Sequence, residues 1–112
     1  MCCNQTPNDR FYEDLADQIW AFAEPGFYEF KSAELLCSVL QEQGFTVQRN
    51  LAGMQTCFAA EFGSGKPVIA VLGEYDALPG MSQLEDADHQ EADPARSCGH
   101  GCGVLAKAFP AL

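Results

Sequence analysis

The stretch from Pro67 to Gly80 constrains the fold more than any other part of the sequence, because an apolar run there changes abruptly into acidic residues. Val68 to Leu72 are consecutive apolar residues, a pattern that favours a strand buried on both faces. Gly73 lets the chain turn at the end of this strand, and Glu74 and Asp76 follow it. Since open α/β sheets bind ligands at the carboxyl ends of their strands, both carboxylates are candidate site residues.

A second group of reactive side chains follows further along the chain, in Cys98-Gly-His100-Gly-Cys102-Gly. Borderline-soft ions such as zinc accept thiolate, imidazole and carboxylate ligands together. A cysteine flanked by glycines at a helix start would also have its thiolate favoured by nearby amide groups. The acidic and the cysteine-rich stretches together therefore have the composition of half a metal site.

The same two stretches, Gly-Glu-Tyr-Asp-Ala-Leu-Pro-Gly and Gly-His-Gly-Cys-Gly, resemble the dinuclear metallo-amidohydrolase and peptidase superfamily. That superfamily includes aminoacylases, hippurate hydrolases and aminobenzoyl-glutamate hydrolases, and the resemblance is closest to the last branch. It runs from about Phe11 to Gly103. The resemblance implies an α/β zinc-peptidase-like catalytic domain with two divalent ions, zinc or manganese. It also implies hydrolysis of an N-acyl amino acid or a dipeptide-like amide such as aminobenzoyl-glutamate, by enzymes that form homodimers.

The resemblance also implies roles for individual residues. Cys102 matches a metal ligand, whereas Asp76 matches an acid that orients the site without binding the metal. His100 matches an earlier histidine of the motif, with a hydrogen-bonding and orienting role. Glu74 stands where other branches carry a metal-binding histidine, and Val104 stands where this branch carries a second histidine ligand. Valine cannot bind a metal.

Several alternatives remain open for these residues. Both acids could be ordinary solvated carboxylates at a strand end, and Cys102 could be a buried structural thiol. A small thiol or metal-binding module built on Cys98, His100 and Cys102 is a different kind of function. A nonfunctional remnant is a third. The general base and remaining ligands of the family would lie beyond Leu112, so we expect the 112-residue chain to be inactive by itself.

Length and charge limit the function further. With 16 acidic against 6 basic residues the net charge is −10, which argues against nucleic acid or an anionic membrane as partner. The sequence contains neither an apolar stretch of membrane-spanning length nor a signal-peptide pattern, so we expect a cytoplasmic protein with a small-molecule substrate. Because family members are several times longer, residues 1–112 are interpreted as the N-terminal part of a catalytic domain.

Hydrophobic periodicity predicts two helices. The first helix starts with Asp9 as its N-cap and buries a stripe of apolar side chains. It ends at Glu24-Pro25-Gly26, since proline cannot continue the helical hydrogen bonds. The second is closed by Gly44. The predicted buried stripes comprise Tyr12, Leu15, Ile19 and Phe22 in the first helix and Ala33, Leu36, Cys37 and Leu40 in the second.

About three strands of a mixed sheet are expected after the helices, over 45–49, 56–62 and 67–72, the last two joined as a hairpin. Cys57 would lie in the second of them as a free buried thiol. The remaining segments are a flexible terminus (1–8), an acidic solvated loop (81–97) with an exposed His89, and an atypical tail (104–112).

Overall fold

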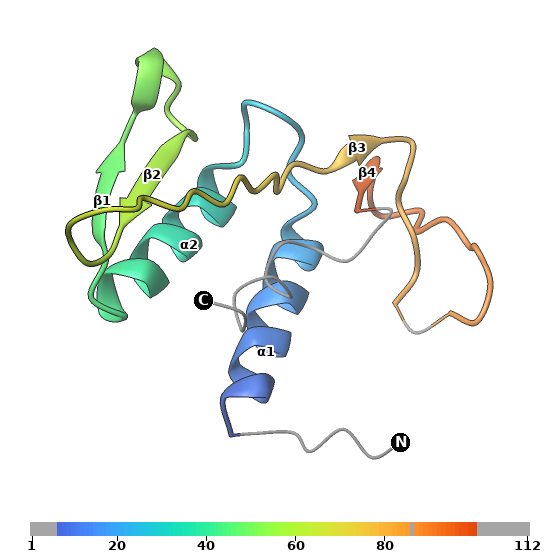
Figure 1. The fold of residues 1–112 in the computed structure, drawn as a ribbon. Coiled ribbons are helices and arrows are strands. Elements are labelled where there is room, and N and C mark those ends of the chain that lie inside the picture. Colours follow the sequence, from blue (N-terminus) through green and yellow to red (C-terminus); the bar gives the residue numbers. More distant parts are fainter. Residues whose placement is uncertain (1–6, 86, 101–112) are drawn as a thin grey trace.

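A computed structural model describes residues 7–85 and 87–100 (Figure 1). Two helices lead the chain, and two small antiparallel sheets follow, which confirms the predicted mixed α/β class. The elements in order are α1 (Pro7–Phe22), α2 (Phe30–Glu42), β1 (Thr46–Arg49), the short 3-10 helix η1 (Leu51–Gly53), β2 (Phe58–Glu61), β3 (Leu78–Pro79) and β4 (Cys98–Gly99). Within this described part, every helix is too short or too polar to cross a membrane.

Helix α1 starts three residues earlier than its sequence predicts. Pro7 is the first helical residue, so Asp9 lies in the first turn and is not the N-cap. Proline suits that position because it has no amide hydrogen to leave unpaired, and its backbone angle is already helical. The Asp9 carboxylate still interacts favourably with the positive end of the helix dipole. At the other end, Ala23 adopts a left-handed φ of 46° and the chain leaves the helix ahead of Pro25.

The loop between the helices caps α2 with a carboxylate that comes from outside the helix. Glu24 Oε1 accepts a hydrogen bond from the Lys31 amide (3.0 Å), and Oε2 accepts from the Ser32 amide (2.9 Å) and hydroxyl (2.8 Å). These bonds satisfy amide groups that have no partner within the helix. Glu24 therefore fixes the turn to the start of α2, and Ser32 is fully buried there.

Gly44 ends α2 as predicted. Its φ is 90°, a left-handed conformation that glycine adopts without steric cost. The Gly44 amide donates to the Gln41 carbonyl and the Phe45 amide donates to the Leu40 carbonyl, both at 3.0 Å. This is the hydrogen-bond pattern of a Schellman motif. It turns the chain directly into β1.

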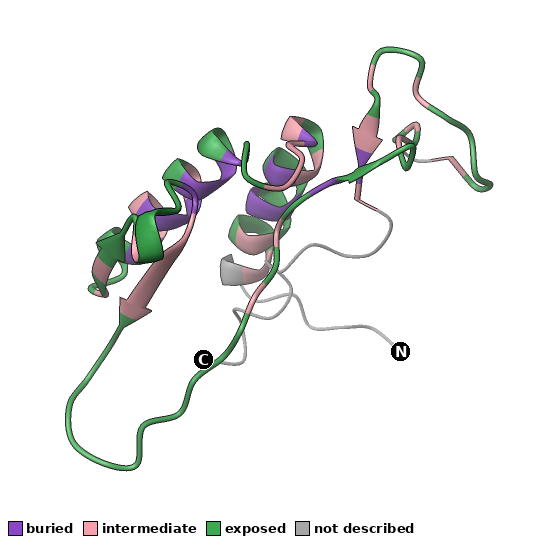
Figure 2. Cartoon of the chain, turned by 90° about the horizontal axis from the view of Figure 1, so that it is seen from above, coloured by how far each residue is buried: buried purple, intermediate pink, exposed green. Residues whose placement is uncertain are grey.

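The core lies between the two helices, where their buried faces meet (Figure 2). Most of the predicted stripe is buried, including Leu15, Ile19, Leu36 and Cys37, whereas Tyr12 and Phe22 are only half-buried. Partly buried side chains complete the cluster, and they are Trp20, Leu35, Val39, Phe58 and Tyr75. Burial of this apolar surface supplies the main favourable term for folding.

Strand β2 pairs with β1, whereas the sequence predicted that it pairs with the run at 67–72. Strands β1 and β2 form an antiparallel hairpin with register Thr46↔Glu61 to Arg49↔Phe58, which confirms strands near 45–49 and 56–62. Cys57 comes immediately before β2 and is a half-buried free thiol, so it is neither in the strand nor fully buried as predicted. In the second sheet, Leu78 of β3 opposes Gly99 of β4.

The strand expected over 67–72 is absent. Val68 is 82% exposed and Leu72 is 91% exposed, and the run belongs to no sheet. The predicted hairpin between 56–62 and 67–72 is therefore wrong, because β2 pairs with β1. A strand buried on both faces needs neighbouring strands and covering helices. The described residues supply neither around Val68 to Leu72.

The acidic segment joins β3 to β4 without a helix or strand in its described residues, as predicted for a solvated loop. His89 is exposed and lies between two carboxylates, Asp88 and Glu91. Near the end of the segment Asp93 pairs with Arg96, at 2.7 Å between Oδ2 and Nε. Arg96 also donates from Nη1 to the carbonyl of Trp20 in α1, so the segment returns to the helices through Arg96.

Candidate functional site

The Glu74 to Ala77 motif is held in place although it forms no strand. The Ala77 amide donates to the Glu24 carbonyl at 2.8 Å, and Ala77 forms a parallel bridge with Pro25. Ala77 is 1% exposed. The turn that caps α2 therefore also holds the acidic motif, and Glu24 links the two.

Tyr75 attaches the motif to the hairpin on its other side. Its hydroxyl donates a hydrogen bond to the Thr56 carbonyl, and its ring lies 6.0 Å from the ring of Phe58, centroid to centroid. Burial, with a smaller contribution from Glu29, raises the pKa of Tyr75 above its ordinary value. The phenol therefore stays protonated and acts as a donor.

His100 lies beside Asp76, so the structure brings together one residue from each predicted motif. Burial lowers the pKa of His100, whereas the nearby Ile19 and Asp76 backbone and the charge of the Asp76 carboxylate oppose that shift. The net lowering favours a neutral imidazole at neutral pH. Its Nε2 is buried and forms no hydrogen bond within the described part of the chain. Asp76 itself is exposed.

The short β3–β4 sheet produces this arrangement. The Gly80 amide donates to the Ser97 carbonyl at 2.8 Å next to the paired strands. Gly99 packs so closely on the returning chain that a β-carbon there would lie 2.8 Å from the Met81 carbonyl carbon and from Ser82 Cα. The glycine before His100 is therefore required by backbone contact.

The other predicted residues contribute less to this geometry. Glu74 is exposed on the motif. Cys98 is a half-buried free thiol whose Sγ lies 3.8 Å from Ser97 Oγ. Cys102 and Val104 lie outside the described residues. Within residues 7–85 and 87–100, no three His, Cys, Asp or Glu side chains gather into a group that could hold a metal ion.

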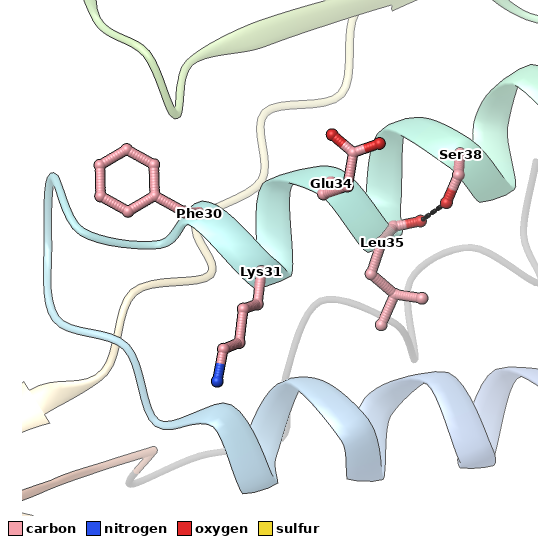
Figure 3. A pocket seen from close by; sticks show the side chains of 5 residues that line it. All are labelled: Phe30, Lys31, Glu34, Leu35 and Ser38. Atoms are coloured by element: carbon pink, nitrogen blue, oxygen red, sulfur yellow. Dashed lines mark hydrogen bonds between the residues drawn. The ribbon is translucent and has the colours of Figure 1, made fainter.

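A shallow pocket on α2 is separate from these residues (Figure 3). It is lined by Phe30, Lys31, Glu34, Leu35 and Ser38. Glu34 pairs with Arg49 of β1, and this hydrogen-bonded ion pair lowers the pKa of Glu34. None of the predicted site residues lines the pocket, so it gives no support to their assignment.

Two further acids, Glu24 and Glu29, were not predicted as residues of interest. Both flank the Pro25-Gly26 turn, which the sequence predicts only as the end of a helix. Glu24 caps α2 and holds Ala77, while Glu29 is a buried acid near Asp76. The sequence offered one signal for these two acids. A carboxylate just before a helix start can accept hydrogen bonds from the unpaired amides of the first turn.

Comparison with known proteins tests the resemblance directly. The chain is 52% identical over 92 residues to a subunit of the p-aminobenzoyl-glutamate hydrolase of Escherichia coli (strain K12). The chain is related to the aminobenzoyl-glutamate hydrolases. The branch predicted from the two motifs is thus confirmed. The match covers 82% of this chain and 19% of that relative, so the chain spans about a fifth of the relative's length. No protein-family profile matches, and no solved structure matches.

Proposed function

We propose that this aminobenzoyl-glutamate hydrolase relative is the N-terminal part of a metal-dependent amidohydrolase or dipeptidase. The substrate class is an N-acyl amino acid or dipeptide-like amide such as aminobenzoyl-glutamate. The observation that carries the proposal is the contact between Asp76 and His100, one from each motif, in a chain 52% identical to a hydrolase subunit. A cytoplasmic location and assembly into homodimers are parts of the same proposal.

The residues of this chain have distinct roles in that function. Asp76 orients the His100 ring, and burial keeps the imidazole neutral so that it exchanges hydrogen bonds without carrying a charge. Cys102 is the thiolate ligand to zinc or manganese. When bound, the metal would lower the pKa of water and polarise the substrate carbonyl. Neither Asp76 nor His100 is assigned as the general base.

The chain by itself is proposed to be inactive, on an argument of ligand number. Two metal ions need several protein ligands, and Cys102 is the single convincing one, since Val104 replaces the expected histidine. A positioned base to activate water is also missing from the matched motifs. One more ligand should therefore improve the affinity for metal. Catalysis, in contrast, requires a complete site.

Calorimetric titration with zinc and an assay on aminobenzoyl-glutamate test these statements. Val104→His should raise zinc affinity by about tenfold or more while turnover stays at background. Cys102→Ser in the Val104→His background should remove the gain. Metal-dependent turnover by the unmodified chain would overturn the proposed inactivity, and equal zinc affinity in all three forms would remove Cys102 as a ligand.

The orienting role of Asp76 needs a separate test in a complete enzyme. The corresponding aspartate of the Escherichia coli relative should be replaced by asparagine, which keeps the side-chain shape. We expect metal content or affinity to fall together with kcat, while unfolding temperature changes little. Full activity and metal content in that variant would contradict the orienting role. The alternative of a small thiol module is not favoured, because the relative is a hydrolase subunit.

A further inference from the structure

The apolar run from Val68 to Leu72 has a free backbone as well as exposed side chains. Figure 1 shows it as an extended segment between the β1–β2 hairpin and β3, and Ile69 within it is 84% exposed. Among the described residues, no backbone hydrogen bond involves residues 67–73. An extended segment with unpaired amides and carbonyls is a template for pairing with another strand.

Opposite charges stand at the two ends of this run. Lys66 precedes it and Glu74 follows it, both are exposed, and residues 67–73 between them carry no charge. Neither side chain forms an ion pair within the part of the chain that the structure describes. Two antiparallel copies of such a segment bring unlike charges together at both ends, whereas two parallel copies bring like charges together.

One antiparallel register of two copies pairs both charges. It places Ala70 opposite the Ala70 of the second copy, and therefore Val68 opposite Leu72 and Lys66 opposite Glu74. Shifting one copy by a single residue leaves both charges opposite uncharged residues. Since unlike charges directly opposite each other stabilise a strand pair, the charges select this register.

Pro67 is compatible with the same register. Opposite residues of an antiparallel pair alternate between hydrogen-bonded and non-hydrogen-bonded positions. When the two Ala70 residues form a hydrogen-bonded pair, Pro67 occupies a non-hydrogen-bonded position, where its missing amide hydrogen costs nothing. Because side chains alternate along a strand, the ion pairs lie on the same face as the pairs of Val68 with Leu72.

We propose that residues 66–74 pair with the same segment of a second copy of this chain, as a two-fold antiparallel strand pair closed by Lys66 and Glu74 at both ends. A two-fold contact uses the same surface on both copies. Growth along the opposite strand edge is disfavoured, because Pro67 cannot donate a hydrogen bond there. A two-stranded contact is small, so the dimer is weak and depends on concentration. The inference does not rest on the proposed hydrolase function, since neither metal nor substrate takes part.

Charge reversal, followed by sedimentation velocity over a range of concentrations, tests the pairing. Lys66→Glu and Glu74→Lys should each weaken the dimer about tenfold, because each variant places like charges opposite each other at both ends. The double variant and an equimolar mixture of the two single variants should both recover the wild-type affinity, since unlike charges face each other again. Absence of recovery in either, or a wild-type chain that stays monomeric, would overturn the proposal.

Net charge alone predicts a different pattern. Lys66→Glu makes the acidic chain more negative and Glu74→Lys makes it less negative, so repulsion between whole chains would weaken the first dimer and strengthen the second. The matched control is Glu61→Lys, which changes an exposed glutamate of β2 by the same charge as Glu74→Lys. It should dimerise at least as well as the wild type. Equal weakening by Glu61→Lys and Glu74→Lys would contradict the strand pair.

Hydrogen exchange in the wild-type chain tests the register without any substitution. At concentrations where the dimer predominates, the amides of Val68, Ala70 and Leu72 should be protected, while those of Ile69 and Val71 should exchange freely. Equal protection of all five amides, or protection of none, would overturn the register. Zinc titration and the aminobenzoyl-glutamate assay are separate measurements, so failure of this dimer and failure of the proposed function are distinguishable.

Discussion

The guanidinium carbon of Arg96 lies 4.5 Å from the centroid of the Trp20 ring. Arg96 Nη1 also donates to the Trp20 carbonyl at 3.3 Å, across 76 residues of sequence. The end of the acidic segment is thereby attached to α1, a few residues before His100. Because the chain contains a single tryptophan, its fluorescence reports this attachment without interference.

We expect Arg96→Ala to release the end of the acidic segment from α1. Trp20 emission should move to longer wavelength and iodide should quench it more strongly, because the ring loses a stacked cation worth about 0.5–1 kcal/mol. Arg96→Lys keeps the charge without the planar group and should give an intermediate result. Identical emission and quenching in all three proteins would contradict this contact.

The same probe reports the titration of Asp93. The Ala95 amide and then Arg96 lower the pKa of this carboxyl below its ordinary value of 3.8. The stabilisation is therefore fully present above that ordinary pKa and is lost as pH falls through the lower folded value. Trp20 fluorescence should stay constant from neutral pH down to about 4 and change below it. The acid transition should be reduced in Asp93→Asn, and superimposable curves for both proteins would refute the assignment.

Gly99→Ala should separate β3 from β4. The added methyl group would meet the Met81 and Ser82 backbone, so we expect a loss of about 1–3 kcal/mol of local stability. Faster hydrogen exchange at the Gly80 amide and a shifted His100 ring resonance would show it. Gly53→Ala is the control for these two local measurements: its φ of 78° strains an alanine, but no atom lies within 4 Å, so the Gly80 exchange rate and the His100 resonance should not change. Equal effects of both substitutions would mean that close packing at Gly99 is unimportant.

The exposed run at 68–72 should drive self-association. Val68 and Leu72 are almost fully exposed, and unpaired apolar β-prone segments associate edge to edge. Val68→Lys with Leu72→Lys should lower the apparent mass in light scattering. Thr46→Lys with Gln48→Lys adds the same charge at exposed positions and should have a smaller effect. If both pairs dissolve the oligomers equally, net charge and not this run controls association.

Cys37 should react slowly with an alkylating reagent in the native chain. It is buried, and burial raises the pKa of its thiol, an effect that the nearby Arg49 only partly opposes. Cys57 and Cys98 are half-buried and should be labelled earlier, with Cys102 expected to be the fastest. Mass spectrometry of timed samples gives the order. Equal native rates for these cysteines, matching those in denaturant, would contradict burial of Cys37.

Local patterns in the sequence determined the two helices and the positions of strands β1 and β2, but not that these two strands pair with each other. Leu15, Ile19 and Leu36 recur at helical spacing, so their burial follows from which face of each helix is apolar. Gly44 ends α2 because only the backbone conformation of that residue matters there. The motifs of Asp76 and His100 likewise predicted the hydrolase branch, since a motif is a local property.

Tertiary structure alone decided which distant residues meet. The apolar run from Val68 to Leu72 has the composition of a buried strand, but it is exposed because strand formation depends on partners elsewhere in space. The contact between Asp76 and His100 depends on the β3–β4 pairing, which no local pattern encodes. Glu29 has the sequence context of a helix cap, yet Glu24 occupies that role and leaves Glu29 buried beside Gly26. Periodicity describes one element at a time, whereas a site depends on the packing that brings separate elements together.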